Sequence, residues 1–566
     1  MNAPSAKLLH VWLALLFVTA TLSAAERPTF SRDVAPILFE HCAPCHKPGP
    51  YAPFTLLSFA DAGKRAKLIA EVTGRRYMPP WLPDQGTNHF ADARVLPDRD
   101  METIRRWAEA GAPEGNPSDL PKLTLNTNEW YLGAPDLIVE APEAFLLPPD
   151  GKDIYQNFVI PSGISTQRLI RAVEILPGNR AAHHGFLKVD LTSGSRRLDA
   201  QYPGGGFPGM DYPSAAAVPD GHLLAWQPGR LPVVSPPGLP WRLQPKSDFL
   251  LQIHFQPTGR QEAIKPKLGL YFTDTPATNQ LFKISMDNYA IDIPAGETNY
   301  VIEESWVVPQ PFEMLALIPH AHRTGKTLEA FATLPDGRRQ DLITIRNWDF
   351  NWQTDYRFAQ PPRFAAGTRL TMRYRYDNST NNAQNPHNPP QRIRYGPQTT
   401  DEMGSVTFQI LTRNQDDLKK LTDAFVLRLR DDVINYAKWK LTQDPEDAHA
   451  HVLMAKVAMH SGDRPSAWSS VRRALKSDPK EPDALYLSGV LHRLENQPDL
   501  AIADFEEVLK AWPDHPKAHG NLGLVFFEMG KLSRAEYHFR EAIKIDPDDT
   551  IARGTLEQIR AKRPRR

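Results

Sequence analysis

Two cysteines and a histidine near the start of the chain form a pattern with a specific chemistry. Cys42, Cys45 and His46 read Cys-x-x-Cys-His, which is the attachment signature of c-type haem. The two thiols add to the haem vinyl groups, and the imidazole becomes an axial iron ligand. A redox-active dithiol is the competing interpretation of the two cysteines. The chain has only these 2 cysteines, so we expect no disulfides to hold the fold.

Met78 is the candidate for the second axial ligand of the iron. It lies in the segment Tyr77-Met78-Pro79-Pro80-Trp81, at a plausible distance after the cysteines. A thioether ligand raises the haem potential, and the alternative role for Met78 is packing in a core. Histidine and methionine together leave no open position on the iron, so this haem would carry electrons rather than bind oxygen.

Five histidines in the middle of the chain form a second group of residues suited to chemistry. Residues i and i+2 of a strand face the same side, so a His-x-His pair can bind one metal ion. Adjacent histidines face opposite sides and need a bend or bulge to share an ion. A lone histidine in a strand is usually structural, but two clusters without thiolates favour copper, zinc or iron. The histidines are the adjacent pair His183 and His184, then His254, and the pair His320 and His322.

Taken in order, these residues resemble the copper type II, ascorbate-dependent monooxygenases, which include peptidylglycine α-hydroxylating monooxygenase and dopamine β-monooxygenase. The resemblance covers about residues 125–415 and rests on four motifs in the same order. The motifs are His-His, Leu-Gln-Ile-His-Phe, His-x-His and Asp401-Glu402-Met403. The family implies two jelly-roll domains that each hold one copper ion.

The resemblance also implies a ligand set for each copper. It assigns His183, His184 and His254 to one ion, and assigns the other to His320, His322 and Met403. The thioether favours copper in its cuprous form. Met314 and Met372 are the competing candidates for that ligand.

The implied reaction inserts one oxygen atom of O2 into a C–H bond, which consumes two external electrons. Oxygen and substrate would meet at the His-His-Met copper, and the other copper would deliver the second electron. We therefore predict an exported dicopper monooxygenase acting on a small-molecule or peptide substrate, with electrons supplied by the fused haem. The alternative is a non-catalytic haem and copper scaffold for electron transfer. A zinc hydrolase is weaker, because the chain lacks a His-Glu-x-x-His motif.

Three positions depart from the family pattern. The peptide-amidating members carry an arginine that grips the substrate carboxylate, and Ile318 stands at that position here. Ser405 and Thr407 stand where those members have asparagine and tyrosine. The bidentate carboxylate clamp is therefore missing, which argues against a glycine-extended peptide substrate.

The predicted secondary structure around these residues changes from helices to strands along the chain. Residues 1–25 have a mildly basic start, an apolar run and small residues before Glu26, as in a signal peptide for export to the bacterial periplasm. Residues 27–120 are expected to form a small all-α, cytochrome c-like haem domain. Short strands between turn signals predict two all-β sandwiches, over 125–275 and 276–415.

The C-terminal region has a helical repeat. Proline recurs every 34 residues from Pro445, and alanine recurs in register with it. This spacing is the tetratricopeptide period, which predicts a connecting helix over 416–447 and a solenoid over 448–562. Repeats of this kind bind a peptide or a partner protein, so we expect a docking or oligomerisation module.

Composition narrows the classes of partner. The 566 residues carry 66 basic and 66 acidic side chains, so the net charge of zero argues against nucleic-acid binding. Hydrophobic residues at 41% and charged residues at 23% are typical of a globular protein. No later segment approaches 18 consecutive apolar residues, so we expect no integral membrane span after signal cleavage.

Overall fold

The computed structural model describes residues 27–48, 52–86, 88–123, 129–210, 212–213, 215–412, 414–546 and 549–562. The predicted signal peptide, residues 1–25, lies outside the described residues. The chain divides into two compact units. The first contains Met1–Pro44, Leu56–Pro79 and Leu96–Thr124, and the second contains Cys45–Thr55, Pro80–Val95 and Leu125–Arg566.

The described part of the first unit is helical. Its core brings Phe30 within 6.2 Å of Trp107 and 5.6 Å of Phe59, measured between ring centroids. The helices begin with a short π-helix, Phe30–Val34, and are followed by a 3-10 turn, Pro117–Asp119. They are α1 (Ala35–His41), α2 (Phe59–Gly63), α3 (Ala66–Gly74) and α4 (Asp98–Glu109).

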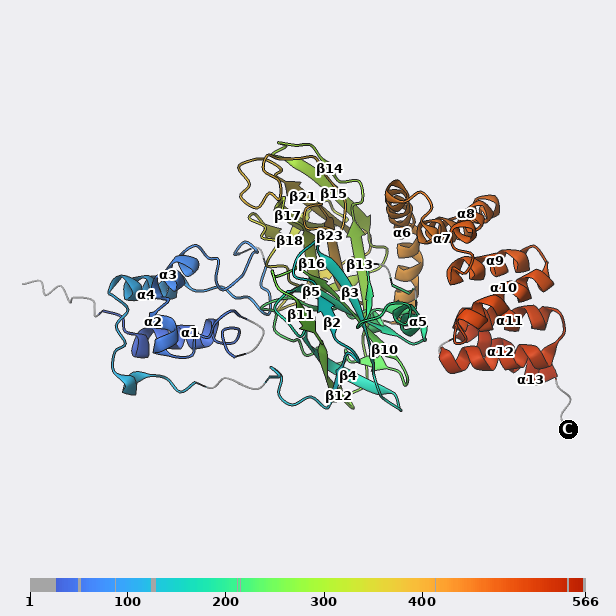
Figure 1. The fold of residues 1–566 in the computed structure, drawn as a ribbon, viewed down its shortest axis with the longest axis horizontal. Helices are drawn as coiled ribbons and strands as arrows, with labels where there is room; N and C mark the ends of the chain where they lie inside the picture. Colours follow the sequence, from blue (N-terminus) through green and yellow to red (C-terminus); the bar gives the residue numbers. More distant parts are fainter. Residues whose placement is uncertain are drawn as a thin grey trace, which may run out of the picture. The chain divides into compact units, whose positions relative to one another are not determined.

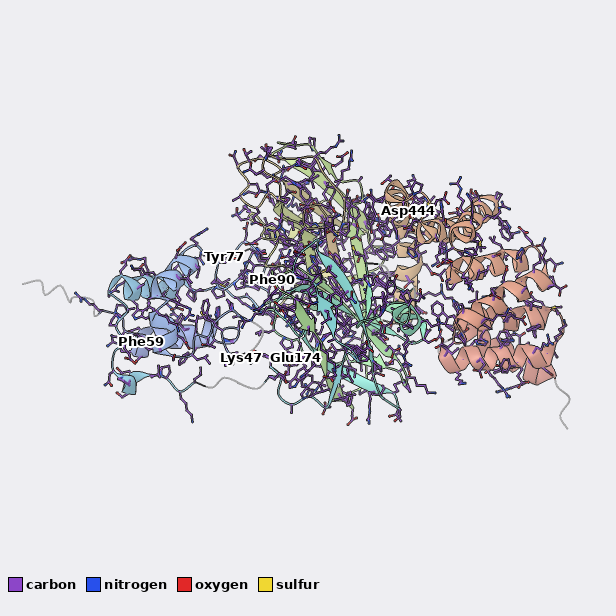
Figure 2. The ribbon with its side chains drawn as sticks, in the orientation of Figure 1. Lys47, Phe59, Tyr77, Phe90, Glu174 and Asp444 are labelled. Carbon is purple, nitrogen blue, oxygen red and sulfur yellow. The ribbon has the colours of Figure 1, made fainter. Side chains whose placement is uncertain are left out.

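Two segments that the sequence places in the haem domain group with the second unit instead. These are Cys45–Thr55 and Pro80–Val95. The second segment packs there through Phe90, whose ring lies 5.2 Å from Phe358 and 5.5 Å from Tyr356 (Figure 2). Aromatic burial against the β-rich region therefore outweighs proximity in sequence to the helices.

The second unit begins with a β-rich region whose paired strands are antiparallel (Figure 1). One sheet has the order β1 (Leu137–Glu140), β12 (Lys267–Thr273), β4 (Arg168–Leu176), β9 (Trp241–Leu243). Another has the order β6 (Phe207–Pro208), β3 (Ile154–Pro161), β10 (Asp248–Phe255), β5 (Ala182–Asp190), β7 (Ala216–Ala217), with β8 (Leu224–Trp226) also paired to β5. A small pair joins β11 (Glu262–Ile264) to β2 (Phe145–Leu147), and α5 (Gly194–Asp199) and a 3-10 turn (Pro219–Gly221) lie between strands.

A second pair of sheets follows along the chain. One has the order β13 (Gln280–Asp287), β23 (Gly404–Thr412), β16 (Phe312–Ala321), β19 (Tyr356–Arg357), with β20 (Arg363–Phe364) paired to β16. The other has the order β15 (Tyr300–Val307), β21 (Arg369–Tyr376), β17 (Gly325–Thr333), β18 (Arg339–Ile345). A short pair joins β14 (Asp292–Ile293) to β22 (Ile393–Arg394).

Each pair of sheets encloses an apolar core. In the first, Phe158 and Phe249 of one sheet pack in the same cluster as Leu268 and Trp241 of the other. In β23 the residues alternate between buried and half-buried, so every second side chain enters the second core. The β-rich region predicted from the sequence is confirmed.

The C-terminal region is a solenoid of paired helices. Figure 1 shows them stacked in sequence order after the long helix α6 (Gln415–Gln443). Small residues allow close packing, because a Cβ added at Gly489 would lie 2.7 Å from the Phe505 ring. The helices are α7 (Ala448–His460), α8 (Arg464–Ser477), α9 (Pro482–Leu494), α10 (Pro498–Ala511), α11 (Pro516–Glu528), α12 (Leu532–Ile545) and α13 (Thr550–Lys562).

The solenoid contacts the first pair of sheets through the turn between α10 and α11. The carboxylate of Asp514 accepts hydrogen bonds from the backbone N–H (2.7 Å) and the hydroxyl (2.6 Å) of Ser193. The guanidinium of Arg197 lies 4.6 Å from the centre of the Trp512 ring. Among the described residues, no helix has the length and apolar character needed to cross a membrane.

Candidate metal centre

The first three histidines meet at the ends of two neighbouring strands. His184 in β5 pairs directly with His254 in β10, but the next pair joins Ala182 to Phe255. His183 is therefore the extra residue of a β-bulge, which turns its side chain towards the same face as its neighbour. One potential ligand atom from each of the three side chains lies within 4.8 Å of the others. The strand thus contains the bulge that two adjacent histidines need in order to face one ion.

A carboxylate and a tyrosine support the His254 ring. Tyr155 in β3 is the cross-strand partner of His254, and the two rings stack at 4.5 Å with an angle of 3°. The Oδ2 atom of Asp153 lies 3.3 Å from Nε2 of His254. Burial by itself would raise the pKa of Asp153. Interactions with the side chains of His254 and Thr399 outweigh this effect and lower the pKa to about 2. Asp153 is thus an anion beside the imidazole, and such carboxylate partners orient metal-binding histidines.

The second pair of histidines lies at the end of β16. His320 is the second-last residue of the strand, and the ring of His322 lies 5.3 Å from that of His320 at an angle of 90°. His320 Nδ1 hydrogen-bonds to Gln353 Oε1, and His322 Nδ1 lies 3.2 Å from the carbonyl oxygen of Asp401. Because both partner atoms are acceptors, each Nδ1 carries the proton and each Nε2 keeps its lone pair.

Glu402 holds the chain around the second pair. One carboxylate oxygen accepts hydrogen bonds from the backbone N–H groups of His322 and Met403. The other oxygen accepts from the backbone N–H and the hydroxyl of Thr324, at 3.0 and 2.6 Å. Burial raises the pKa of Glu402 to about 7, although the hydrogen bonds that it accepts lower it.

Met403 sits across from the second pair of histidines. Ala321 pairs with Gly404, and His320 pairs with Ser405, in the ladder between β16 and β23. Continuing this register by one residue places Met403 opposite His322, and cross-strand partners share a face. The two other candidate methionines, Met314 and Met372, are fully buried in the apolar core.

The two sets of histidines form one continuous cluster. The ring centroids of His184 and His320 are 6.2 Å apart. Phe350 lies between the sets, stacked on His183 at 4.3 Å and 5.5 Å from His322. The β-bulge of the first pair of sheets and the end of β16 therefore face each other directly.

The environment keeps the imidazoles of His183, His184, His320 and His322 neutral. Burial lowers the pKa of His183 to about 3 and that of His320 to about 4. Burial also holds the pKa of His184 and of His322 well below the usual range, and neighbouring imidazoles lower both further. A neutral imidazole has a free lone pair, which is the form that binds a metal ion.

Two ring nitrogens of the first set are suited to bind a metal ion. His183 Nε2 and His254 Nδ1 are buried and have no hydrogen-bond partner among the residues that the structure describes. In addition, the Nδ1 atoms of His183 and His184 face each other at 3.0 Å. Buried polar atoms normally have partners, so converging neutral nitrogens without them fit a metal ion. Nitrogen donors without thiolates suit copper, zinc or iron, and a nearby thioether favours copper.

The haem-type motif spans the boundary between the two units. Cys42 follows α1 in the first unit and Met78 follows α3 there, whereas Cys45 and His46 belong to the second unit. Neither cysteine forms a disulfide. In the second unit, His46 Nδ1 lies 3.0 Å from the carbonyl oxygen of Phe54, which orients the ring and leaves Nε2 as the ligand atom.

Sequence reasoning missed several residues that build this centre. Asp153, Tyr155, Phe350 and Gln353 were not singled out, and Glu402 was noted only as part of a motif. The sequence offered one signal for Tyr155, which is the alternation of residues along β3. Tyr155 lies opposite His254 in the neighbouring strand, so the two side chains share a face. Phe350 and Gln353 lie on an irregular segment after β18, where no periodic pattern signals orientation.

Comparison with known proteins identifies the C-terminal region. A tetratricopeptide repeat family model matches residues 452–505 and 495–550. The predicted helical repeats are therefore confirmed as tetratricopeptide repeats, and the class of protein they define is one with a repeat solenoid attached to a β-rich region.

Individual relatives share only part of their length with this chain. Anaphase-promoting complex subunit 3 of Schizosaccharomyces pombe is 21% identical over 205 residues, which are 33% of this chain and 30% of that protein. Protein bimA of Emericella nidulans is 30% identical over 139 residues, 22% of this chain and 17% of that protein. The crystal structure of MamA is 21% identical, with a TM-score of 0.22, and covers 26% of this chain and 84% of that chain. The chain thus spans less than a third of the length of the two curated relatives.

Proposed function

We propose that this chain is an exported, copper-dependent monooxygenase that hydroxylates a C–H bond with O2. The observation that carries the proposal is the convergence of the first three histidines. Their ligand atoms lie within 4.8 Å of one another, and buried ring nitrogens of His183 and His254 have no hydrogen-bond partner among the described residues. A structural role would leave such nitrogens hydrogen-bonded, because unsatisfied buried polar atoms are costly. The order of the histidine and methionine motifs supports the copper monooxygenase class and its jelly-roll domains.

The chain's residues divide the centre into two ligand sets. His183, His184 and His254 would hold one copper ion, oriented by the bulge in β5. His320 and His322, with Met403, would hold the other. Copper in these sets supplies one-electron redox chemistry and oxygen activation when it is bound.

Hydrogen bonds and ring stacking from neighbouring residues fix the orientation of the histidine ligands. Gln353 and the carbonyl of Asp401 hold the Nδ1 protons of His320 and His322, so both rings offer Nε2. Asp153 and Tyr155 hold the ring of His254. Phe350 is fully buried, stacks on His183 at 4.3 Å and also contacts His322.

The Cys-x-x-Cys-His motif supports a covalent c-type haem in the same chain. Cys42 and Cys45 would attach it, and His46 and Met78 would be its axial ligands. A chain-borne haem would relay electrons, one at a time, from an external donor to the copper centre. Haem attachment and the apolar N-terminal segment both point to export, in a bacterium to the periplasm.

The repeat solenoid favours a second role beside catalysis. Tetratricopeptide repeats present an extended surface to a protein partner, so the solenoid would dock a redox protein, a substrate protein or another subunit. A non-catalytic scaffold that carries haem and copper is the alternative function. It predicts the same metals but no consumption of O2 with any donor.

Metal content tests the proposal directly. We would measure copper and iron by mass spectrometry in the matured full-length protein, in His320→Ala and in His460→Ala. His460 is an exposed histidine of α7, so its loss controls for the substitution itself. We expect about two copper ions and about one iron per chain, with about one copper in His320→Ala only. Iron without copper, even after reconstitution with Cu(I), would contradict the monooxygenase proposal.

A further inference from the structure

A cavity lies beside Gln353, the residue that hydrogen-bonds to His320. It has a volume of about 240 Å³ and lies between the loop after β8 and the loop that joins β18 to β19. Gly229 lies on its wall in the first loop, and Trp352 and Gln353 lie on its wall in the second. The segment Pro80–Val95 contributes Arg94. These elements all belong to the second unit.

One wall of the cavity touches the haem-type motif. The Sγ atom of Cys45 lies 3.7 Å from the carbonyl oxygen of Gly229. A Cβ built on Gly229 would lie 3.7 Å from the guanidinium of Arg94 and 4.0 Å from the Trp352 ring. Cys45, Arg94 and Trp352 therefore lie around the same glycine, whose φ of +78° is a conformation that favours glycine.

Lys47, the residue that follows the motif, holds it at this wall. Lys47 is buried, and its ammonium lies 5.5 Å from the centre of the Tyr131 ring. Glu174 lies nearby, as Figure 2 shows, and its carboxylate accepts hydrogen bonds from the backbone N–H groups of Tyr131 (2.6 Å) and Leu132 (3.2 Å). The β-rich region thus holds the second cysteine of the motif against the cavity.

The wall carries one unmatched positive charge. Arg230 pairs with Asp355 at 2.6 Å, and Arg357 pairs with Asp92 at 2.5 Å. Arg94 has no carboxylate within ion-pair distance among the residues that the structure describes. Burial raises the pKa of the Cys45 thiol, and the charges of Arg94 and Lys47 oppose that rise. An anionic group placed beside Cys45 would therefore find Arg94 as its partner.

The opposite wall of the cavity leads to the back of His320. Gln353 Oε1 accepts from His320 Nδ1, and Gln353 Nε2 donates to the carbonyl of Phe350 at 3.0 Å. The cavity consequently meets the His320 ring on the side away from Nε2. A substrate there could not reach a metal ion on Nε2, but a redox group there would be coupled to His320 through a single side chain.

We propose that this cavity is the electron-entry port of the histidine centre. Arg94 would hold a carboxylate of a haem attached at Cys45, and the Trp352–Gln353 segment would link that haem to His320. This inference rests on the proposed function. The haem and copper would exchange one electron, with ferrous haem oxidised and one cupric ion reduced, and no proton or atom would be transferred. Arg94 and Gln353 are positioning residues whose own covalent state does not change.

The test uses the matured, copper-loaded full chain and three arginine variants. Arg94→Gln removes the charge, Arg94→Lys keeps it, and Arg363→Gln is the matched control. Arg363 is 79% exposed, pairs with Glu313 at 2.9 Å and does not line the cavity. The readouts are the midpoint potential of the haem, from a redox titration followed in the visible spectrum, and the rate of haem re-oxidation after rapid reduction.

We expect Arg94→Gln to lower the haem potential, because removing a nearby positive charge stabilises the ferric form. The lower potential increases the driving force for electron transfer from the haem to copper. Re-oxidation should nevertheless slow about tenfold or more, because the haem loses the charge-assisted hydrogen bond that holds it in position. Arg94→Lys should keep most of both properties, and Arg363→Gln should match the parent. Gln353→Leu should slow re-oxidation and leave the haem potential unchanged.

The outcomes separate this inference from the proposed function. A parent protein with haem and copper in which Arg94→Gln behaves like Arg363→Gln overturns the port and leaves the monooxygenase standing. An unchanged re-oxidation rate in Gln353→Leu overturns the route through Gln353. A parent protein that binds copper but carries no covalent haem overturns the port and leaves the copper centre standing, whereas one that binds no copper overturns the proposed function.

Discussion

Glu402 is the residue whose replacement should most clearly disturb the second ligand set. Its two carboxylate oxygens together accept hydrogen bonds from the backbone N–H groups of His322, Thr324 and Met403 and from the Thr324 hydroxyl. Glu402→Gln preserves the shape of the side chain but turns one oxygen into an NH2 group, which cannot accept. Glu402→Ala removes both acceptors.

The hydrogen bonds set the expected loss of stability. In Glu402→Gln, the NH2 group can face Thr324, whose hydroxyl rotates to accept from it, and one backbone N–H is left unpaired. A buried unpaired donor costs about 1–3 kcal/mol, which is the expected decrease in the free energy of unfolding. Glu402→Ala leaves three backbone N–H groups unpaired, so the decrease should be at least about 3 kcal/mol.

Urea unfolding of the metal-free protein, followed by tryptophan fluorescence, measures these differences. Glu303→Gln is the control, because Glu303 is about half exposed and pairs with Arg373 at 2.7 Å on the outside of the sheet. Copper content should fall by about one ion per chain in Glu402→Ala and stay unchanged in the control. The reasoning fails if Glu402→Ala unfolds at the same urea concentration as Glu303→Gln.

Three further predictions concern packing, pH and metal. Gly489→Ala should lower the free energy of unfolding of the solenoid by about 1–3 kcal/mol, because its Cβ would meet the buried Phe505 ring. Gly554→Ala should raise the free energy of unfolding by up to about 1 kcal/mol, because Gly554 faces open space within a helix. Thermal unfolding of the two variants measures both changes. Burial raises the pKa of Asp287 from 3.8 to about 6, so the parent should lose stability relative to Asp287→Asn as the pH rises from about 4 through 6. Urea midpoints at pH 4.5 and 7.5 test the sign, and equal differences at both would contradict it. Copper at about 100 times its dissociation constant should stabilise the parent by about 2.7 kcal/mol, a chelator should remove the gain, and His184→Ala should reduce it.

The helical repeats were predictable because their signals are local. Pro445, Pro479 and Pro513 each follow a helix end within two residues, at Gln443, Ser477 and Ala511. Ala467, Ala501 and Ala535 recur at the same interval and are fully buried where helices touch. Each repeat meets its neighbours in sequence, so a periodic pattern reports both the element and its contacts.

The β-rich region was predictable in type and only partly in arrangement. Alternation over 370–376 indicated a strand, and β21 occupies Arg369–Tyr376. The partners of that strand are β15 and β17, which lie far from it in sequence. Alternation shows which side chains share a face, but it does not determine which strands pair or in what register.

In the candidate metal centre, too, residue types could be read from the sequence but their spatial arrangement could not. The amino-acid sequence is enough to identify the candidate ligands: imidazoles in pairs, a methionine after Asp401-Glu402, and a Cys-x-x-Cys-His motif. The folded chain is needed to know that His184 lies 6.2 Å from His320, that Phe350 contacts both His183 and His322, and that Cys45 lies against Gly229. Residue types and spacings are local properties, whereas these contacts depend on the register of paired strands and on loops whose positions follow from packing between distant segments.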